Sequence, residues 1–343
     1  MSKIEWLARE GTKPVSWNPL RARLPPELTD DLDGGGKVGH HCEKVSPGCA
    51  SCYAETYQPR FGTGQPYTRK SRDLVETYLD PEVLAQPLHW RKPRTVFVCS
   101  QTDLFGEWVP DEEIATIFGV MAACLDSTFI VLTKRPARMA DVLRRYHPAL
   151  RWPAHKSHTY YARRLVAIEQ QKIPLPLLAA NGDAWPLPNV WLMVSAEDQQ
   201  RADERIPHLL RCPAAVRGVS LEPLLMPIDI KLYLPLTTHG RGGPIKATGG
   251  LDWLIVGGES GLKARPCDVE WIRSIVQQGA EAGCQVFAKQ LGARPVTKWP
   301  TKWPGYDLRV NLDEEALSIK LRSPKGAAMS EWPEDLRVRE WPR

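Results

Sequence analysis

The feature that most constrains the fold is a repeated alternation of short apolar runs with helical segments. Six runs rich in β-branched and other apolar residues are each followed by polar residues and, in most cases, by a helical pattern. Continuous apolar runs of this length are typical of strands buried on both faces, as in parallel sheets. The runs are residues 95–99, 129–132, 189–194, 216–219, 253–256 and 285–288, with a further candidate near 15–18.

The segments between these runs have helical periodicity. In 111–126 apolar residues recur every three or four positions, and Asp111 is the expected N-cap. In 268–283 Asp268 is the expected N-cap and Gly283 the residue after the helix end. Shorter helices are predicted at 137–146 and 203–211. Alternating strands and helices predict an α/β fold with a parallel (β/α) barrel or partial barrel of about six to seven strands. An open doubly wound sheet is the main alternative.

The domain organisation follows from where this rhythm is interrupted. We expect a barrel over residues 1–292 and an irregular Trp- and Pro-rich extension over 293–343, packed on the barrel. Three insertions are expected within the barrel, at about 20–39, 147–188 and 228–250. The first is predicted to be a loop because it is rich in Pro and Gly, and the last a mobile loop or a small hairpin.

Composition excludes several classes of protein. No apolar run approaches the ~20 residues that a membrane span needs, so no membrane partner is expected. The first ten residues contain acids and no apolar signal core, which argues against secretion. The eight cysteines therefore favour metal binding or buried thiols over a disulfide framework. We expect a cytoplasmic protein in a reducing environment.

The strongest local signal is a C-x6-C-x2-C motif formed by Cys42, Cys49 and Cys52. A C-x2-C pair places two thiolates within reach of one metal centre, and the third cysteine returns through the turn predicted at residues 46–48. Thiolates suit iron–sulfur clusters and zinc. Three ligands leave one position open, which in a cubane 4Fe–4S cluster is one iron free to bind a substrate or cofactor.

Two other interpretations of this motif stay open. His40 or His41 would complete a Cys3His zinc site, and the three thiols would otherwise be unligated structural residues. The remaining cysteines are scattered and are expected to be buried small apolar residues. Among these, Cys99 adjoins the predicted site.

Polar clusters follow the C-terminal ends of the predicted strands, the face on which α/β folds place their chemistry. Strands that simply end in polar loops would give the same pattern, but six clusters favour a shared site. The clusters include Ser100-Gln101-Thr102-Asp103, Lys134-Arg135, Ser195-Ala196-Glu197, Glu222-Pro223, Gly257-Gly258-Glu259 and Lys289-Gln290.

Several of these motifs together resemble a known family. They are Trp17-Asn18-Pro19, Lys44-Val45-Ser46-Pro47-Gly48-Cys49, Cys52-Tyr53-Ala54-Glu55, Asp103-Leu104-Phe105, Leu132-Thr133-Lys134-Arg135-Pro136, Ser220-Leu221-Glu222-Pro223, Val256-Gly257-Gly258-Glu259-Ser260-Gly261 and Lys289-Gln290. Over residues 14–292 the chain resembles the phage gene-product thirty-seven/sixty-eight family. Its cysteine motif is similar to that of radical S-adenosylmethionine enzymes, although the first gap is six residues rather than three.

The resemblance implies a chemistry and a set of roles. Cys42, Cys49 and Cys52 would hold the 4Fe–4S cluster, and S-adenosylmethionine would bind the fourth iron and yield a 5′-deoxyadenosyl radical on one-electron reduction. The expected cofactor-binding residues are Tyr53, Ser100, Gln101, Asp103, Ser195, Glu197, Gly257, Gly258 and Glu259. The expected catalytic or substrate-contacting residues are Lys134, Glu222 and Lys289. For the glycine pair a tight turn is the alternative, and for Glu222 a capping or supporting role.

A basic stretch points to a polyanionic partner. Residues 134–164 contain nine basic residues and one acid, interleaved with Tyr146, Trp152, Tyr160 and Tyr161. Basic side chains neutralise phosphates while aromatic rings stack on bases, although a solvated face with buried aromatics fits equally well. The expected substrate is a nucleic acid or nucleotide and the expected reaction base modification or repair. An external electron donor would be needed, and a partner protein encoded nearby is a further expectation.

Two other functions remain open at this point. One is a non-enzymatic zinc-binding or iron–sulfur protein that binds nucleic acid. The other is a barrel hydrolase or transferase that uses a carboxylate such as Glu222 or Glu259, with structural cysteines.

Overall fold

The structure, a computed structural model, describes residues 4–28, 37–145, 186–235, 237–240, 243–246, 249–297, 308–311 and 316–342. Its largest sheet has seven strands in the order β1 (Lys13–Trp17), β5 (Arg94–Val98), β6 (Thr128–Thr133), β7 (Val190–Ser195), β8 (Val216–Leu221), β11 (Trp253–Gly257) and β13 (Gln285–Gln290). Six of these strands coincide with the predicted apolar runs and β1 with the further candidate near 15–18, which confirms the α/β class and the parallel partial barrel.

The chain forms two compact units, and the boundary between them falls inside β7. The first unit comprises residues 1–192 and 211–215, and the second comprises 193–210 and 216–343. Among the described residues of both units, no helix combines the length and the apolar character that crossing a bilayer requires. Most of the insertion predicted at 147–188 lies outside the described residues.

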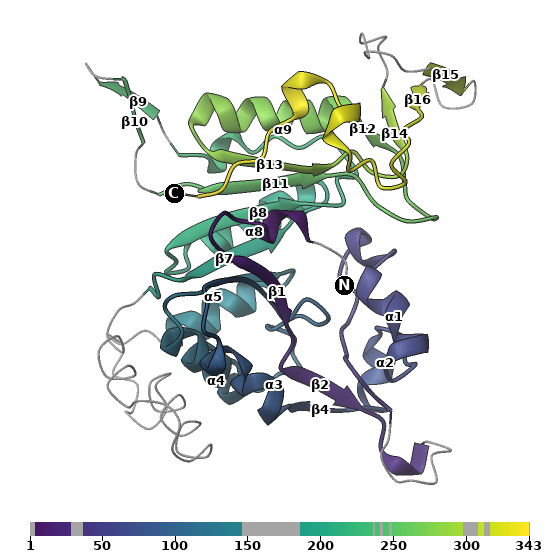
Figure 1. The fold of residues 1–343 in the computed structure, drawn as a ribbon, viewed down its shortest axis with the longest axis vertical. Helices are drawn as coiled ribbons and strands as arrows, with labels where there is room; N and C mark the ends of the chain where they lie inside the picture. Colours follow the sequence, from purple (N-terminus) through teal and green to yellow (C-terminus); the bar gives the residue numbers. More distant parts are fainter. Residues whose placement is uncertain are drawn as a thin grey trace. The chain divides into compact units, whose positions relative to one another are not determined.

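The first unit joins part of the parallel sheet to a small antiparallel one (Figure 1). Its helices are α1 (Tyr53–Phe61), α2 (Arg69–Arg72), α3 (Pro81–Ala85), α4 (Asp111–Ala123) and α5 (Pro136–Arg145), with 3-10 turns η1 (Glu5–Leu7), η2 (Pro26–Leu28), η3 (Pro47–Cys49) and η4 (Gln86–His89). The antiparallel sheet has the order β3 (Val38–Gly39), β2 (Leu20–Arg23), β4 (Glu76–Leu79). The prediction of a loop over 20–39 is therefore wrong at both ends of that segment, because each end pairs with a strand.

A tryptophan anchors the core of the first unit. Trp17 is 1% exposed, and its ring meets Phe129 edge-on with 5.8 Å between ring centroids. Its indole N–H donates a hydrogen bond of 2.7 Å to the carbonyl of Val83, so the one polar atom of this large side chain is satisfied. The end of β1 is thus fixed where the following residues enter the predicted site.

Helix α4 buries the predicted apolar stripe but begins differently from the prediction. Pro110 is the N-cap, and Asp111 is the first helical residue. The Asp111 carboxylate instead pairs with Arg138 at 3.2 Å and with Arg145 at 2.7 Å, both from α5. The predicted cap is therefore wrong, and the carboxylate joins two helices.

The second unit contains β8, β11 and β13 with the helices α8 (Gln199–Leu210) and α9 (Val269–Ala282). Helix α9 packs along β11 and β13 (Figure 1). Both predicted boundaries of α9 are confirmed. The carboxylate of Asp268 accepts a hydrogen bond from the Glu270 N–H at 3.0 Å, and Gly283 adopts a left-handed φ of 66°.

The C-terminal extension is more regular than predicted. A four-stranded sheet has the order β12 (Cys267–Asp268), β14 (Pro295–Thr297), β16 (Ala316–Ile319), β15 (Leu308–Asn311), so the prediction of an irregular tail is wrong there. The last residues do pack on the sheet of the second unit. Trp253 donates to the carbonyl of Glu340 at 2.8 Å, and the Trp341 ring lies 5.1 Å from that of Phe287.

The remaining elements of the second unit are short. Strands β9 (Thr237–Gly240) and β10 (Gly243–Lys246) form an antiparallel hairpin, one of the two predicted possibilities for 228–250. The 3-10 turns are η7 (Lys231–Tyr233), η8 (Met329–Glu331) and η9 (Glu334–Leu336).

The cap of α9 gives a first prediction. Asp268→Ala should lower the free energy of unfolding by about 1 kcal/mol or more, because the Glu270 N–H loses its acceptor. Asp268→Asn keeps an acceptor at the same place and should lose clearly less. Urea unfolding followed by circular dichroism measures both, and equal losses in the two variants would contradict the capping role.

Candidate functional site

The three cysteines lie on one segment of the first unit. Cys42 follows β3, Cys49 closes η3, and Cys52 is the N-cap of α1. The predicted turn before Cys49 is present, because its N–H donates to the carbonyl of Ser46 at 2.9 Å. All three are free thiols of intermediate exposure, so a small group has access to them.

The cysteines share one electrostatic environment. Burial raises the pKa of the Cys42 thiol to about 12, and the negative charges of Asp103, Cys52 and Cys49 add to this, while Arg135 opposes it. The thiols are thus close enough for the charge of one to act on another. Within the part of the chain that the structure describes, no three His, Cys, Asp or Glu side chains form a preassembled metal site.

The cysteine segment is attached to the C-terminal end of β5. The Tyr53 hydroxyl donates to the carbonyl of Ser100 at 2.6 Å, and the Tyr67 hydroxyl donates to that of Gln101 at 2.7 Å. The hydroxyl of Thr102 donates to the carbonyl of His41. Cysteines remote from the sheet in sequence are thereby held at the strand ends where α/β folds place their chemistry.

The end of β1 joins the same place. The side-chain oxygen of Asn18 accepts hydrogen bonds from the Ser100 hydroxyl at 3.2 Å and from the Gln101 N–H at 3.0 Å. Between β5 and this contact, Cys99 has a φ of 53°, an uncommon conformation for a residue with a side chain. Strained backbone of this kind is concentrated at functional sites.

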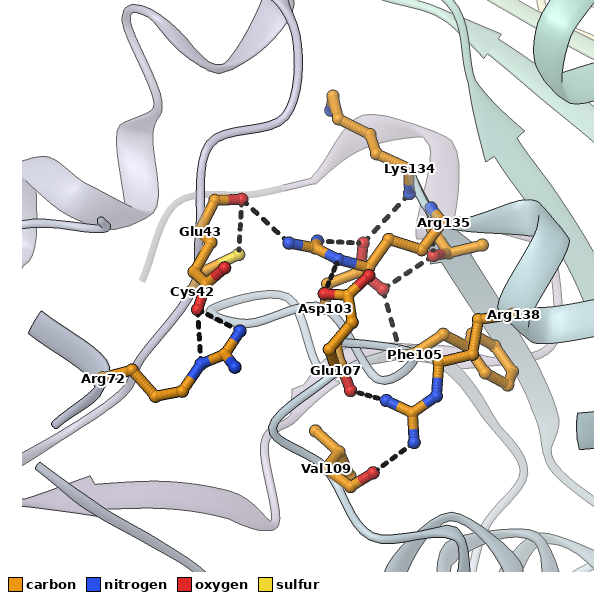
Figure 2. A network of polar contacts seen from close by, with 12 residues as sticks. Cys42, Glu43, Arg72, Asp103, Phe105, Glu107, Val109, Lys134, Arg135 and Arg138 are labelled. Carbon is orange, nitrogen blue, oxygen red and sulfur yellow. Dashed lines mark hydrogen bonds and ion pairs between the residues drawn. The ribbon is translucent and has the colours of Figure 1, made fainter. Parts of the chain in front are cut away.

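Arg135, which follows β6, connects the loops around the cysteines (Figure 2). Its guanidinium pairs with Asp103 at 3.2 Å and with Glu107 at 2.8 Å, and it donates to the carbonyl of Glu43, next to Cys42. The same group lies 4.7 Å from the centre of the Trp108 ring. A buried cation therefore links the loops after β5 and β6 to the cysteine segment.

Asp103 has all its acceptor capacity engaged within the protein. One oxygen accepts from the Thr133 hydroxyl at 2.7 Å and the Phe105 N–H at 3.0 Å, and the other from Lys134 N–H and Arg135. The residue is 7% exposed. Its observed contacts join two loops rather than face a cofactor. The Lys134 side chain points away from this network in Figure 2.

Three of the predicted cofactor-binding residues line a single pocket of about 420 Å³. These are Tyr53, Ser100 and Gln101. The other residues around the pocket are Ile4, Ser16, His40, Tyr57, Gln58 and Phe61. All of them belong to the first unit.

His40 and His41, the two histidines beside the cysteine motif, contact different charged side chains. His40 Nε2 lies 3.3 Å from the Arg21 guanidinium, and burial with this cation lowers the pKa of His40 to about 4. His41 is 3% exposed, with Nε2 3.6 Å from the Glu43 carboxylate and its ring edge-on to Trp108. Both surroundings favour the neutral imidazole, which is the form that binds zinc, so these contacts do not distinguish the Cys3His alternative from a cluster.

In the second unit, Glu222 and Lys289 form a pair at the ends of β8 and β13. The Lys289 ammonium donates to both Glu222 oxygens, at 2.7 and 2.9 Å, and the Gln290 amide donates to one of them at 3.1 Å. The Ser195 hydroxyl lies 3.5 Å from the Glu222 carbonyl. The structure thus brings together four residues from three of the predicted polar clusters, namely Ser195, Glu222, Lys289 and Gln290.

The two other predicted acids of the second unit are held in ion pairs. Glu197 is fully buried and lies 3.2 Å from Arg205, which also donates to the Ser195 carbonyl. Glu259 is 6% exposed and accepts three hydrogen bonds, of 2.8, 2.9 and 2.5 Å, from the backbone and guanidinium of Arg265. Both acids have structural partners that the sequence did not indicate.

The glycine pair has a packing reason. A Cβ on Gly258 would lie 2.4 Å from the carbonyl oxygen of Leu291, and one on Gly257 would lie 2.9 Å from that of Gln290. The close approach therefore occurs between the end of β11 and the backbone at the end of β13, which is neither a cofactor contact nor the tight turn of the alternative prediction.

The described part of the basic stretch 134–164 is largely neutralised. Arg135 pairs with Asp103, Arg138 and Arg145 pair with Asp111, and Arg144 pairs with Asp141 at 3.0 Å. Lys134 is described as well. The four interleaved aromatic residues and the remaining basic residues, Arg151, Lys156, Arg163 and Arg164, lie outside the described residues.

A family model described as a protein of unknown function, DUF5131, matches residues 37–326, from before the first cysteine to beyond β16. The chain belongs to the DUF5131 family. No curated protein and no solved structure gives a significant match to it. The match of the DUF5131 family includes the cysteine segment, the Arg135 network and the Glu222–Lys289 pair.

The Arg135 network gives a prediction with a built-in control. Asp103→Ala should lower the free energy of unfolding by about 3 kcal/mol, because it leaves a buried guanidinium without its buried partner. Glu107→Ala removes a carboxylate from the same guanidinium, but its side chain is 57% exposed, so the loss should stay below about 1 kcal/mol. Equal losses, measured by urea unfolding, would argue against Asp103 as the principal partner.

The glycines give another prediction. Gly258→Ala should lower the free energy of unfolding by about 1–3 kcal/mol because its new methyl group overlaps backbone, and Gly257→Ala should lose less. If the glycines served only the approach of a cofactor, both variants would melt at the wild-type temperature.

Proposed function

We propose that this protein is an iron–sulfur enzyme of the radical S-adenosylmethionine type that acts on a nucleic acid or nucleotide. The observation that carries the proposal is the placement of Cys42, Cys49 and Cys52. The charges of Cys49 and Cys52 act on the Cys42 thiol, and all three thiols are partly exposed. Hydrogen bonds attach their segment to the C-terminal ends of β5 and β6, and Asn18 joins the end of β1 to the same loop.

The donor set fits a cluster by its chemistry. Three thiols, rather than four, leave one iron of a 4Fe–4S cluster without a protein ligand. The Arg135 guanidinium opposes the rise in the pKa of Cys42 and so favours the thiolate that ligation requires.

When bound, the cluster would pass one electron from an external donor to the sulfonium of S-adenosylmethionine, which breaks into methionine and a 5′-deoxyadenosyl radical that takes a hydrogen atom from the substrate. The residues of the chain hold and shield this chemistry. Tyr53, Ser100 and Gln101 line the pocket beside the cysteine segment. A reducing cytoplasm suits such a protein.

The predicted catalytic residues have separate parts in the proposal. The Lys289 ammonium donates to both oxygens of Glu222, and such a pair can serve as a general acid or base at the strand ends of the second unit. The backbone N–H of Lys134, after β6, donates to Asp103, while its side-chain cation points away from the Asp103 network and can meet an anionic substrate.

Anaerobic purification followed by metal analysis tests the proposal. The wild-type protein should contain iron and sulfide, and with dithionite and S-adenosylmethionine it should release 5′-deoxyadenosine. A variant with Cys42, Cys49 and Cys52 all replaced by alanine should lose both. Cys124→Ala, a partly exposed thiol outside the motif, should keep them.

Each rival function predicts a different result. Zinc in place of iron, lost in His40→Ala or His41→Ala, would favour a Cys3His site in a binding protein. Turnover in air without reductant, abolished in Glu222→Gln but not in the cysteine variant, would favour a hydrolase or transferase.

A further inference from the structure

Helix α1 presents an exposed aromatic face directly after the last cysteine of the motif. Tyr53, Tyr57 and Phe61 are 51%, 44% and 67% exposed, well above what is usual for such large rings. They recur at every fourth position of the helix and so share one face. All three line the pocket of about 420 Å³ beside the cysteine segment.

The pocket also offers hydrogen-bonding groups. Neither the hydroxyl of Ser16 nor the side-chain amide of Gln101 makes a hydrogen bond to another described residue. Both line the same pocket as the three aromatic rings. Rings that stack and an amide that both donates and accepts are the groups that proteins use for an unpaired nucleobase.

The surroundings of the pocket favour a polymer over a free nucleotide. Phe61, the most exposed of the three rings, carries the Arg60 guanidinium 5.0 Å from its centre. The segment 53–72 contains four basic residues and one acid. Of these, Arg60, Arg69 and Lys70 are exposed and form no ion pair with a described residue. Stacking surface and cations therefore continue outside the pocket, where a strand with further bases and phosphates would lie.

We propose that this face of α1 binds single-stranded nucleic acid, with one base stacked on the rings of Tyr57 and Phe61 and the flanking backbone on Arg60. A duplex hides the faces of its bases, so a single strand is the form that this surface recognises. The claim that this face binds the enzyme's substrate rests on the proposed function, whereas the claim that it binds single-stranded nucleic acid does not. We place the nucleic-acid contact here instead of on the stretch 134–164, because the described arginines of that stretch are already paired.

Fluorescence anisotropy with a labelled mixed-sequence 12-mer tests the binding. Tyr57→Ala combined with Phe61→Ala should weaken binding at least about five-fold. Leu28→Ala, which removes a 54% exposed apolar side chain elsewhere in the first unit, should leave binding unchanged. Arg60→Gln should lower the slope of log affinity against log salt by about one. Equal affinity of the double variant and the wild type, no binding at low salt, or preference for a duplex would overturn the proposal.

Photocrosslinking locates the contact without relying on a variant. An oligonucleotide with 5-iodouracil should crosslink to peptides that contain Tyr57 or Phe61, and crosslinks confined to 134–164 would overturn the proposal. The protein with all three motif cysteines replaced by alanine should bind and crosslink like the wild type. Loss of the cluster and loss of nucleic-acid binding are therefore distinguishable.

Discussion

The ion pair between Arg135 and Asp103 is the interaction on which the arrangement of the cysteine segment depends. A guanidinium and a carboxylate that are almost fully buried are unfavourable unless each has hydrogen-bond partners on several sides. Here the partners come from the loops after β5 and β6 and from the backbone beside Cys42. Satisfying the pair therefore fixes the three segments relative to one another, and the position of the first cysteine follows.

The parallel sheet explains why residues distant in sequence meet here. Strands β1, β5 and β6 run in the same direction, so the residues after Trp17, Val98 and Thr133 emerge at one edge. Their side chains and backbone provide the attachment points for a segment that begins only after β3. The uncommon backbone of Cys99 lies in the middle of these attachments. The cluster proposal and the nucleic-acid proposal concern neighbouring parts of this one edge.

The sequence predicts the fold well because strand burial leaves a direct trace. Six of the seven parallel strands were identifiable as apolar runs, and β1 was expected only as a further candidate. Helix α9 was predicted with both of its ends because Asp268 and Gly283 have distinctive capping roles. The strands of the C-terminal extension were missed because each has at most four residues, too few to form a recognisable apolar run. Asp111 was predicted as a cap because its interhelical partners Arg138 and Arg145 cannot be recognised from spacing.

The site was predictable only in its residue types. The sequence indicates the three cysteines and the polar strand ends, and the structure brings Glu222, Lys289 and Gln290 together. It does not reveal that Glu197 and Glu259 are paired with arginines, or that Gln58, 2% exposed, joins His40 to α1 by accepting its N–H. Such partners are set by tertiary packing.

A cluster held by three thiols would leave one iron open to S-adenosylmethionine. Low-temperature electron paramagnetic resonance of the dithionite-reduced protein detects this directly. We expect the signal of a reduced 4Fe–4S cluster whose g-values shift when S-adenosylmethionine is added. A spectrum that S-adenosylmethionine leaves unchanged, or reduced protein without any iron–sulfur signal, would contradict this expectation.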